Sequence, residues 1–165
     1  MSLFENDEYR WRETYFVMLK SESRPTGEAV QSILKSLNRR YDLGTPLTND
    51  SGQLQSMYLY SPDDNAAMDI SYIEGDEVTE QIDEMIDDIK SSASTDVERD
   101  LVRQLPECNA RLDVFHFEKL NFTGGEEEEE EDEFLDPGSL LIVLEQLADL
   151  CHGIAVDPQT GSVVT

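Results

Sequence analysis

The chain has 165 residues, a mean hydropathy of -0.50 and a net charge of -25, from 37 Asp and Glu against 12 Lys and Arg. Proteins bind a phosphate backbone by neutralising it with Lys and Arg, so this charge balance argues against direct binding to nucleic acid. An anionic membrane surface is disfavoured for the same reason. Basic proteins remain as partners of compatible charge.

Length and composition are typical of one globular domain, and we expect residues 1–165 to form a single α+β domain. No apolar run approaches the roughly 20 residues of a membrane-spanning helix. The first residues, MSLFENDEYRWRE, lack the apolar segment of a signal peptide. The two cysteines, Cys108 and Cys151, are therefore expected to stay reduced, and the protein is expected to be cytoplasmic.

The negative charge is concentrated in two blocks. Residues 61–100 contain fourteen acidic and two basic residues, and residues 118–136 contain ten acidic residues and one basic residue. The second block includes six consecutive glutamates, at positions 126–131. Like charges at this density repel one another and cannot form a core, so residues 121–135 are predicted to be an acidic, mobile internal loop.

The first half of the chain reads as a strand, a helix and a hairpin. Residues 13–19, ETYFVML, are rich in β-forming residues on both faces, which is typical of a central strand. Thr26 is a suitable N-cap for a helix that reaches about Tyr41, with Gly44 at its stop. Residues 54–60 and 66–73 are predicted to pair as an antiparallel hairpin.

An amphipathic helix is predicted over residues 75–90, GDEVTEQIDEMIDDIK. Apolar residues recur at helical spacing along one side of it: Val78, Ile82, Met85, Ile86 and Ile89. The other side is almost purely anionic, and its members are Glu77, Glu80, Asp83, Glu84, Asp87 and Asp88. One face must therefore be buried, and the other can contact only solvent or a cationic partner.

The second half continues with a short helix, a strand, a long helix and a closing hairpin. Thr95 and Glu98 form a capping-box pattern, and Pro106 ends the short helix. Residues 110–120 form the next strand. Asp136-Pro137 is typical of a helix start, and Gly153 is predicted to be the C-cap of that apolar helix. Residues 154–156 and 162–164 form the closing hairpin.

The element order is therefore β-α-β-β-α-(α)-β-α-β-β. Its first elements match the split arrangement of ferredoxin-like folds. The predicted fold is α+β, with a ferredoxin-like β-α-β-β-α-β core and an additional C-terminal helix and β-hairpin. Many functions share that topology, so it does not select one.

The sequence contains no catalytic signature. The GxSxG, phosphate-loop and GxGxxG patterns are absent, and we expect no catalytic residues and no cofactor. Cys151 and His152 are neighbours at a predicted helix C-terminus, where the helix dipole raises the pKa of a thiol. Two histidines and two distant cysteines lack zinc spacing, and no loop has the calcium-binding pattern, so no metal site is expected.

The leading hypothesis is a non-enzymatic, acidic interaction or regulatory module that binds a basic protein surface through the anionic face of residues 75–90. The simpler interpretation of that face is a solvated surface that maintains solubility. The alternative function is a small-molecule or cation-responsive sensor, with a pocket beside Tyr58, Tyr60, Tyr72 and His116. A third is an enzyme that uses His116 with a neighbouring carboxylate. The sequence predicts no oligomeric state.

Overall fold

The structure is a computed structural model that describes residues 7–62, 65–119 and 138–164. Its strands are β1 (Tyr9–Leu19), β2 (Asp42–Leu43), β3 (Leu47–Thr48), β4 (Leu54–Ser61), β5 (Ala66–Glu74), β6 (Ala110–Lys119), β7 (Ile154–Asp157) and β8 (Ser162–Val163). Its helices are α1 (Gly27–Leu37), α2 (Asp76–Ser92), α3 (Asp96–Gln104) and α5 (Gly138–Cys151), with short 3-10 turns η2 (Ser21–Ser23) and η4 (Leu105–Glu107). The acidic loop predicted at 121–135 and the helix start predicted at Asp136-Pro137 lie outside the described residues.

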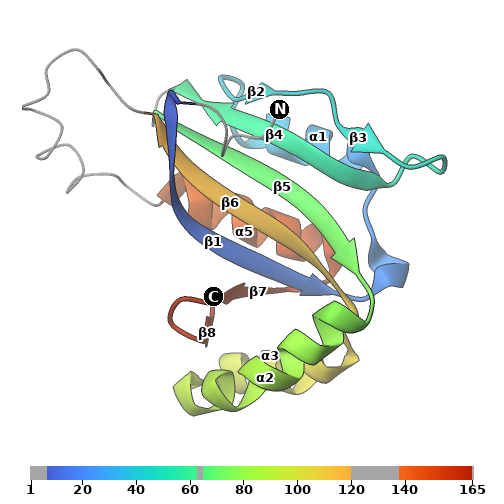
Figure 1. The fold of residues 1–165 in the computed structure, drawn as a ribbon, viewed down its shortest axis with the longest axis vertical. Coiled ribbons are helices and arrows are strands. Elements are labelled where there is room, and N and C mark those ends of the chain that lie inside the picture. The colour runs from blue at the N-terminus through green and yellow to red at the C-terminus, as the bar shows by residue number, and fades with distance from the viewer. Residues whose placement is uncertain (1–6, 63–64, 120–137, 165) are drawn as a thin grey trace, which may run out of the picture.

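All described strands belong to one antiparallel sheet in the order β2-β4-β5-β6-β1-β7-β8, with β3 also paired to β4 (Figure 1). β1 pairs with β6 on one side and β7 on the other, so the predicted central strand is confirmed. The hairpin of β4 and β5 is confirmed as well. The chain is thus an α+β protein built on an antiparallel sheet.

The ferredoxin-like topology is not confirmed. A split β-α-β unit places another strand between its two parallel strands. Here β5 and β6 are direct antiparallel neighbours, and Glu74 at the end of β5 lies opposite Ala110 at the start of β6. α2 and α3 are therefore a helical connection within a hairpin, rather than a crossover to a parallel strand. Element order alone does not distinguish these two routes.

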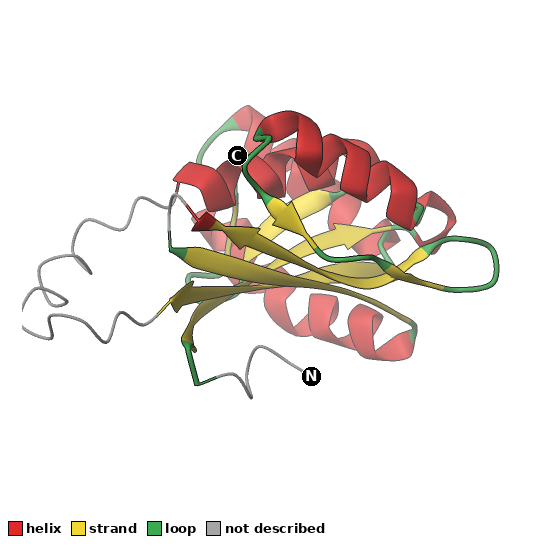
Figure 2. Ribbon diagram, turned by 90° about the horizontal axis from the view of Figure 1, so that it is seen from above, coloured by secondary structure: helices red, strands yellow, loops and turns green. Residues whose placement is uncertain are grey.

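Helices cover both faces of the sheet (Figures 1 and 2). α1 and α5 lie together on one face, where Leu34 and Leu144 join the larger hydrophobic core. α2 and α3 lie on the opposite face, at the end of the sheet near β7 and β8. The rest of that second face, over β4, β5 and the C-terminal half of β6, has no described helix on it.

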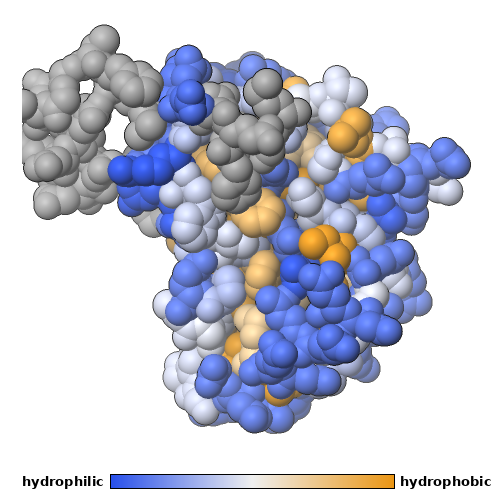
Figure 3. Space-filling model, viewed as in Figure 1, coloured by the Kyte–Doolittle hydropathy of each residue, from blue (hydrophilic) through white to orange (hydrophobic). Residues whose placement is uncertain are grey.

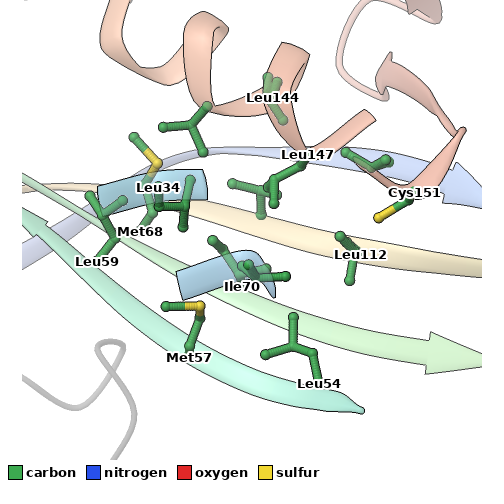
Figure 4. Packing of buried hydrophobic residues seen from close by; sticks show 14 of the residues in the cluster. Leu34, Leu54, Met57, Leu59, Met68, Ile70, Leu112, Leu144, Leu147 and Cys151 are labelled. Carbon is green, nitrogen blue, oxygen red and sulfur yellow. The ribbon is translucent and has the colours of Figure 1, made fainter. Parts of the chain in front are cut away.

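The larger core is formed between the sheet and the pair α1 and α5 (Figure 4). Leu34 projects from α1, and Leu144 and Leu147 project from α5, toward Ile70 and Leu112 of the sheet. Alternation along β1 divides its side chains between two cores: Val17 and Leu19 belong to this one, and Phe16 and Met18 pack against α2 and α3. The last four residues of β1, 16–19, are thus buried on both faces, as the composition of this segment predicted.

Helix caps explain where α1 begins and ends. The predicted N-cap, Thr26, is confirmed, because its Oγ1 accepts a hydrogen bond from the Ala29 amide at 3.0 Å. The predicted end near Tyr41 is wrong, because the helix stops at Leu37 and Asn38 has extended dihedrals. The Asn38 side chain accepts from the Arg40 amide at 2.9 Å, an Asx turn that competes with helix. Tyr41 is nevertheless buried, from the turn that follows.

The capping box of α3 is confirmed at its N-cap, because Thr95 Oγ1 accepts from the Glu98 amide at 3.1 Å. The C-terminus of α5 differs from the prediction. His152, rather than Gly153, has the left-handed conformation, with φ 53°. The Gly153 amide donates to the Ala148 carbonyl at 2.8 Å, which makes this end a Schellman motif with histidine at the usual glycine position. Within the described residues, every helix is too short or too polar to span a membrane.

Candidate interaction surface

The anionic face of α2 is the first candidate surface. Val78, Ile82 and Ile89 are buried against the sheet, which confirms the predicted apolar stripe. The six acidic residues singled out from the sequence are all exposed: Glu77, Glu80, Asp83, Glu84, Asp87 and Asp88. Figure 3 shows this side of the molecule, and hydrophilic residues predominate where Figure 1 places α2. The helix therefore presents its carboxylates to solvent from a rigidly packed backbone.

These carboxylates have no ion-pair partner among the described residues. The neighbouring helix α3 is different, because its exposed acids pair within the helix. Asp96 accepts from Arg99 at 3.0 Å, and Asp100 accepts from Arg103 at 2.8 Å. α3 thus pairs its exposed carboxylates with arginines, and α2 concentrates uncompensated negative charge.

The four residues of the predicted pocket lie on two different faces of the sheet. Tyr58 and Tyr60 are on the face that α2 partly covers, within a small hydrophobic cluster around Phe117. Tyr72 and His116 are on the opposite face, beside the larger core, because β5 and β6 place them in phase with Ile70 and Val114. The sheet therefore separates the two pairs, and the structure does not bring these four side chains together.

The local contacts of Tyr72 and His116 also keep them apart. Tyr72 donates to Glu74 at 2.8 Å and lies 4.0 Å below the Arg24 guanidinium, and burial raises the pKa of its hydroxyl. His116 lies four residues away along the sheet, with its Nδ1 atom 3.5 Å from Oε1 of Glu13. His116 lowers the pKa of Glu13 by offering it a hydrogen-bond donor. Glu13 is the neighbouring carboxylate that the enzyme hypothesis requires.

A buried group of charged residues, which sequence reasoning missed, lies on the face shared with α2. Asp69, Arg111 and Asp113 are 8%, 8% and 5% exposed. Arg111 donates from Nε to Asp113 Oδ1 at 2.6 Å, and its guanidinium carbon lies 4.6 Å from the centre of the Phe16 ring. Arg111 Nη1 is buried and has no hydrogen-bond partner among the described residues. We call these three residues the buried charge cluster.

The two carboxylates of the buried charge cluster differ in their partners. Asp69 accepts one hydrogen bond, from Ser71 Oγ at 3.1 Å, whereas Asp113 is bound by a guanidinium. Burial raises the pKa of both carboxyls. The hydrogen bond from Ser71 acts in the opposite direction and lowers the pKa of Asp69, and the charge of Arg111 likewise lowers the pKa of Asp113. Glu77 of α2 and Asp69 also raise the pKa of Asp113, so the first turn of α2 lies within electrostatic range of the cluster.

An aromatic patch adjoins the buried charge cluster on the part of this face that carries no described helix. It consists of Tyr9, Tyr58, Tyr60 and Phe115, which pack around Ala67 and Phe117. The rings of Tyr9 and Tyr60 are 5.9 Å apart, and Trp11, opposite Phe117 in the register, is 46% exposed. Figure 3 shows a pale strip of weakly polar and apolar residues through the middle of this side. Such a surface can contact another protein or a cationic side chain.

The alternation of β5 and β6 contained the signal that would have found this cluster. Asp69 and Asp113 occupy adjacent strands in the same phase, and the register places them diagonally, because Asp69 is opposite Phe115 and Asp113 is opposite Ser71. The sequence does not show that β5 and β6 are neighbouring strands, and without that pairing the two carboxylates could not be placed together.

Other chemistry is limited in the described part of the chain. No group of three or more His, Cys, Asp or Glu side chains there is arranged to hold a metal ion. Both cysteines are buried, which raises the pKa of the Cys108 thiol to about 11 and that of the Cys151 thiol to about 12. Neither thiol is activated as a nucleophile.

Comparison of the chain with protein-family models, with curated protein sequences and with solved structures found no match.

Proposed function

We propose that this chain is a non-enzymatic interaction or regulatory module that binds a basic protein surface through the anionic face of α2. The observation that carries the proposal is the contrast between two adjacent helices. The exposed carboxylates of α2 lack ion-pair partners among the described residues, whereas Asp96 and Asp100 of α3 each have an arginine. Solubility alone would be served as well by mixed charges.

The energetics of α2 support the same proposal. Glu80 and Glu84, Asp83 and Asp87, and Glu84 and Asp88 are like-charge pairs one helical turn apart. Each pair destabilises a helix by about 0.2–0.5 kcal/mol. A basic surface placed along this face would relieve all three repulsions at once. Because α2 is anchored by Val78, Ile82 and Ile89, its backbone is already in place before a partner arrives.

The sensor alternative receives less support. It required Tyr58, Tyr60, Tyr72 and His116 around one pocket, and the first two lie on the opposite face of the sheet from the last two. The enzyme alternative has a histidine beside a carboxylate, but a structural contact between two neighbouring strands accounts for that arrangement equally well.

The experiment compares three forms of the full chain as baits in a lysate of the source organism. The test variant carries Asp83→Asn, Glu84→Gln, Asp87→Asn and Asp88→Asn. The control removes four exposed charges elsewhere, through Glu22→Gln, Glu28→Gln, Asp50→Asn and Glu145→Gln. We expect a defined basic protein to be captured at physiological salt by wild type and by the control, and lost with the test variant. Equal capture by all three forms would contradict the proposal.

A further inference from the structure

One row of side chains crosses the sheet from β2 to β1 on the face that α2 partly covers. The register joins Asp42 of β2 to Tyr60 of β4, Tyr60 to Ala67 of β5, Ala67 to Phe117 of β6, and Phe117 to Trp11 of β1. Residues directly opposite one another in a sheet have their Cβ atoms about 4.5–5.5 Å apart. The row therefore has a carboxylate at one end and a tryptophan at the other.

Two tyrosines lie against the middle of this row. Ala67 and Phe117 are completely buried, and Tyr9 of β1 and Tyr60 of β4 pack against them. The two tyrosine rings are 5.9 Å apart and tilted by 54° to each other. β1 and β4 are separated in the sheet by β5 and β6, so the small side chain of Ala67 leaves room for these rings to meet.

The outer groups of the row are open to solvent. Trp11 is 46% exposed, Asp42 is exposed, and both tyrosines are only partly buried. The two tyrosine hydroxyls and the carboxylate of Asp42 have no hydrogen-bond or ion-pair partner among the described residues, and none of these oxygens is buried. The indole N–H of Trp11 donates to Thr14 Oγ1 at 3.1 Å, so Trp11 offers a partner the surface of its ring. We call this set of side chains the exposed row: Trp11, Tyr9, Tyr60 and Asp42.

Carboxylates lie close to the rings of the exposed row. Burial is the main cause that raises the pKa of the Tyr9 hydroxyl, and its neighbour Tyr60 raises it further. The remaining causes are two negative charges, those of Glu8 and Asp42. The face of an aromatic ring attracts a cation, and a carboxylate beside the ring adds a direct attraction between opposite charges. The exposed row therefore suits a positively charged side chain.

The exposed row lies on the same face of the sheet as α2. Phe117 is in phase with Asp113 along β6, and Asp113 is opposite Phe16, which packs in the core beneath α2. The two arginines of β1, in contrast, bind Glu118, which follows Phe117 along β6 and so points to the other face. A basic partner can thus approach the row from the side of α2.

We infer that the exposed row binds an arginine side chain of the basic partner, with the guanidinium against the rings of Tyr9 and Tyr60 and beside the carboxylate of Asp42. This inference rests on the proposed function and adds a second contact surface to it. Arginine suits the row better than lysine, because a planar guanidinium stacks on aromatic rings and also donates hydrogen bonds to a carboxylate. A second copy of this chain is not the occupant, because two chains of net charge -25 repel each other.

The test uses two peptides of equal charge, one of alternating arginine and glycine and one of alternating lysine and glycine. Fluorescence anisotropy of their fluorescein-labelled forms measures their affinities for the full chain at physiological salt. The variants are Asp42→Asn, Tyr60→Leu and the four-site α2 variant described above, with Asp50→Asn as a control that removes one exposed charge. Thermal unfolding verifies that each form is folded. Because Asp42 is exposed, Asp42→Asn keeps the test valid if Tyr60→Leu fails to fold.

Trp11 provides a second measurement. It is the only tryptophan in the chain, so its fluorescence reports on the exposed row directly. Quenching of that fluorescence by acrylamide is measured with and without saturating unlabelled arginine peptide. A peptide that lies along the row covers part of the indole ring and should reduce the quenching.

We expect wild type to prefer the arginine peptide, and Asp42→Asn and Tyr60→Leu each to lose about threefold in affinity for it. The α2 variant should weaken both peptides. If Asp42→Asn binds as tightly as Asp50→Asn, or if bound peptide leaves the quenching of Trp11 unchanged, the inference is overturned, and weaker binding by the α2 variant still supports the proposed function. If the α2 variant binds as wild type does while Asp42→Asn is weaker, the α2 function falls and the exposed row stands. Failure of wild type to bind either peptide overturns both.

Discussion

Arg111 donates a hydrogen bond from Nε to Oδ1 of Asp113 at 2.6 Å, between two side chains that are almost completely buried. The two residues are two positions apart on β6, so they lie on the same face of one strand. Their pairing compensates one of the two carboxylates that this strand and β5 place on the face that α2 partly covers. The stability of this part of the fold should therefore depend on both members of the pair.

Replacing Arg111 by methionine should lower the free energy of unfolding by about 3–5 kcal/mol, because Asp113 is left as an uncompensated buried charge. Urea denaturation measures the change. The matched control is the double variant Arg111→Met with Asp113→Leu, in which both charges are removed and most of the stability should return. A double variant as unstable as the single one would mean that packing of the arginine on Phe16, rather than charge pairing, supports the strand.

Replacing Asp69 by asparagine should stabilise the protein at neutral pH by about 1 kcal/mol, because an unpaired carboxylate no longer has to be desolvated. Burial raises the pKa of this carboxyl above its ordinary value of 3.8. The folded chain thus holds the proton to a higher pH than the unfolded chain does, and the stability of wild type falls as the pH rises from 3.8 through the folded-state pKa. The advantage of the variant should shrink as the pH falls toward 3.8.

Urea denaturation of wild type, Asp69→Asn and Asp50→Asn at several pH values between neutrality and mild acid tests this dependence. Asp50 is exposed, so its replacement should leave the pH dependence unchanged. Lower stability of Asp69→Asn at every pH would show that the carboxylate contributes more through Ser71 than its burial costs.

Local patterns in the sequence predicted local structure well. The caps at Thr26 and Thr95 and the apolar stripe of α2 depend on neighbouring residues only, and all three are present. β5 also shows the residue-by-residue alternation of a strand, with Ile70 facing the larger core and Asp69 facing the other side. These features follow from the periods of helix and strand, which any single sequence displays.

The arrangement of the strands was not predictable in the same way. A helical segment between two strands is compatible with a crossover or with a long hairpin connection, and β5 and β6 follow the second route. Two consequences escaped sequence reasoning. Tyr58 and His116 were expected beside one pocket but lie on different faces, and the burial of Asp69 was not predicted. Both depend on which strands are neighbours and on which faces the helices cover.

Replacing Glu84 by glutamine should stabilise the protein by about 0.4–1 kcal/mol at low ionic strength, because it removes repulsion with both Glu80 and Asp88. The gain should decrease as salt is added, since these charges are exposed and screened. Thermal unfolding over a salt series measures it. Glu28→Gln is the control: Glu28 lies in the first turn of α1, where the helix dipole favours a negative charge, so its replacement should destabilise slightly. A stability of Glu84→Gln that does not depend on salt would contradict the energetic argument for α2.

The C-terminus of α5 gives the last prediction, in which two neighbouring residues respond in opposite directions. His152 has φ 53°, a conformation that costs a residue with a side chain about 1–2 kcal/mol and glycine almost nothing. His152→Gly should therefore stabilise the protein by about 0.5–1 kcal/mol, somewhat less than that cost because glycine also increases the entropy of the unfolded chain.

Gly153→Ala should have the opposite effect, because an added Cβ would lie 2.5 Å from the carbonyl oxygen of Met18. Met18 belongs to the central strand β1, which is paired on both sides and cannot move away, so we expect a loss of about 1–3 kcal/mol. Urea denaturation of the two single variants compares them directly. A neutral Gly153→Ala would mean that β1 and the end of α5 can separate slightly without loss of packing. If His152→Gly is also neutral, the Schellman cap at this end contributes little to the stability of the fold.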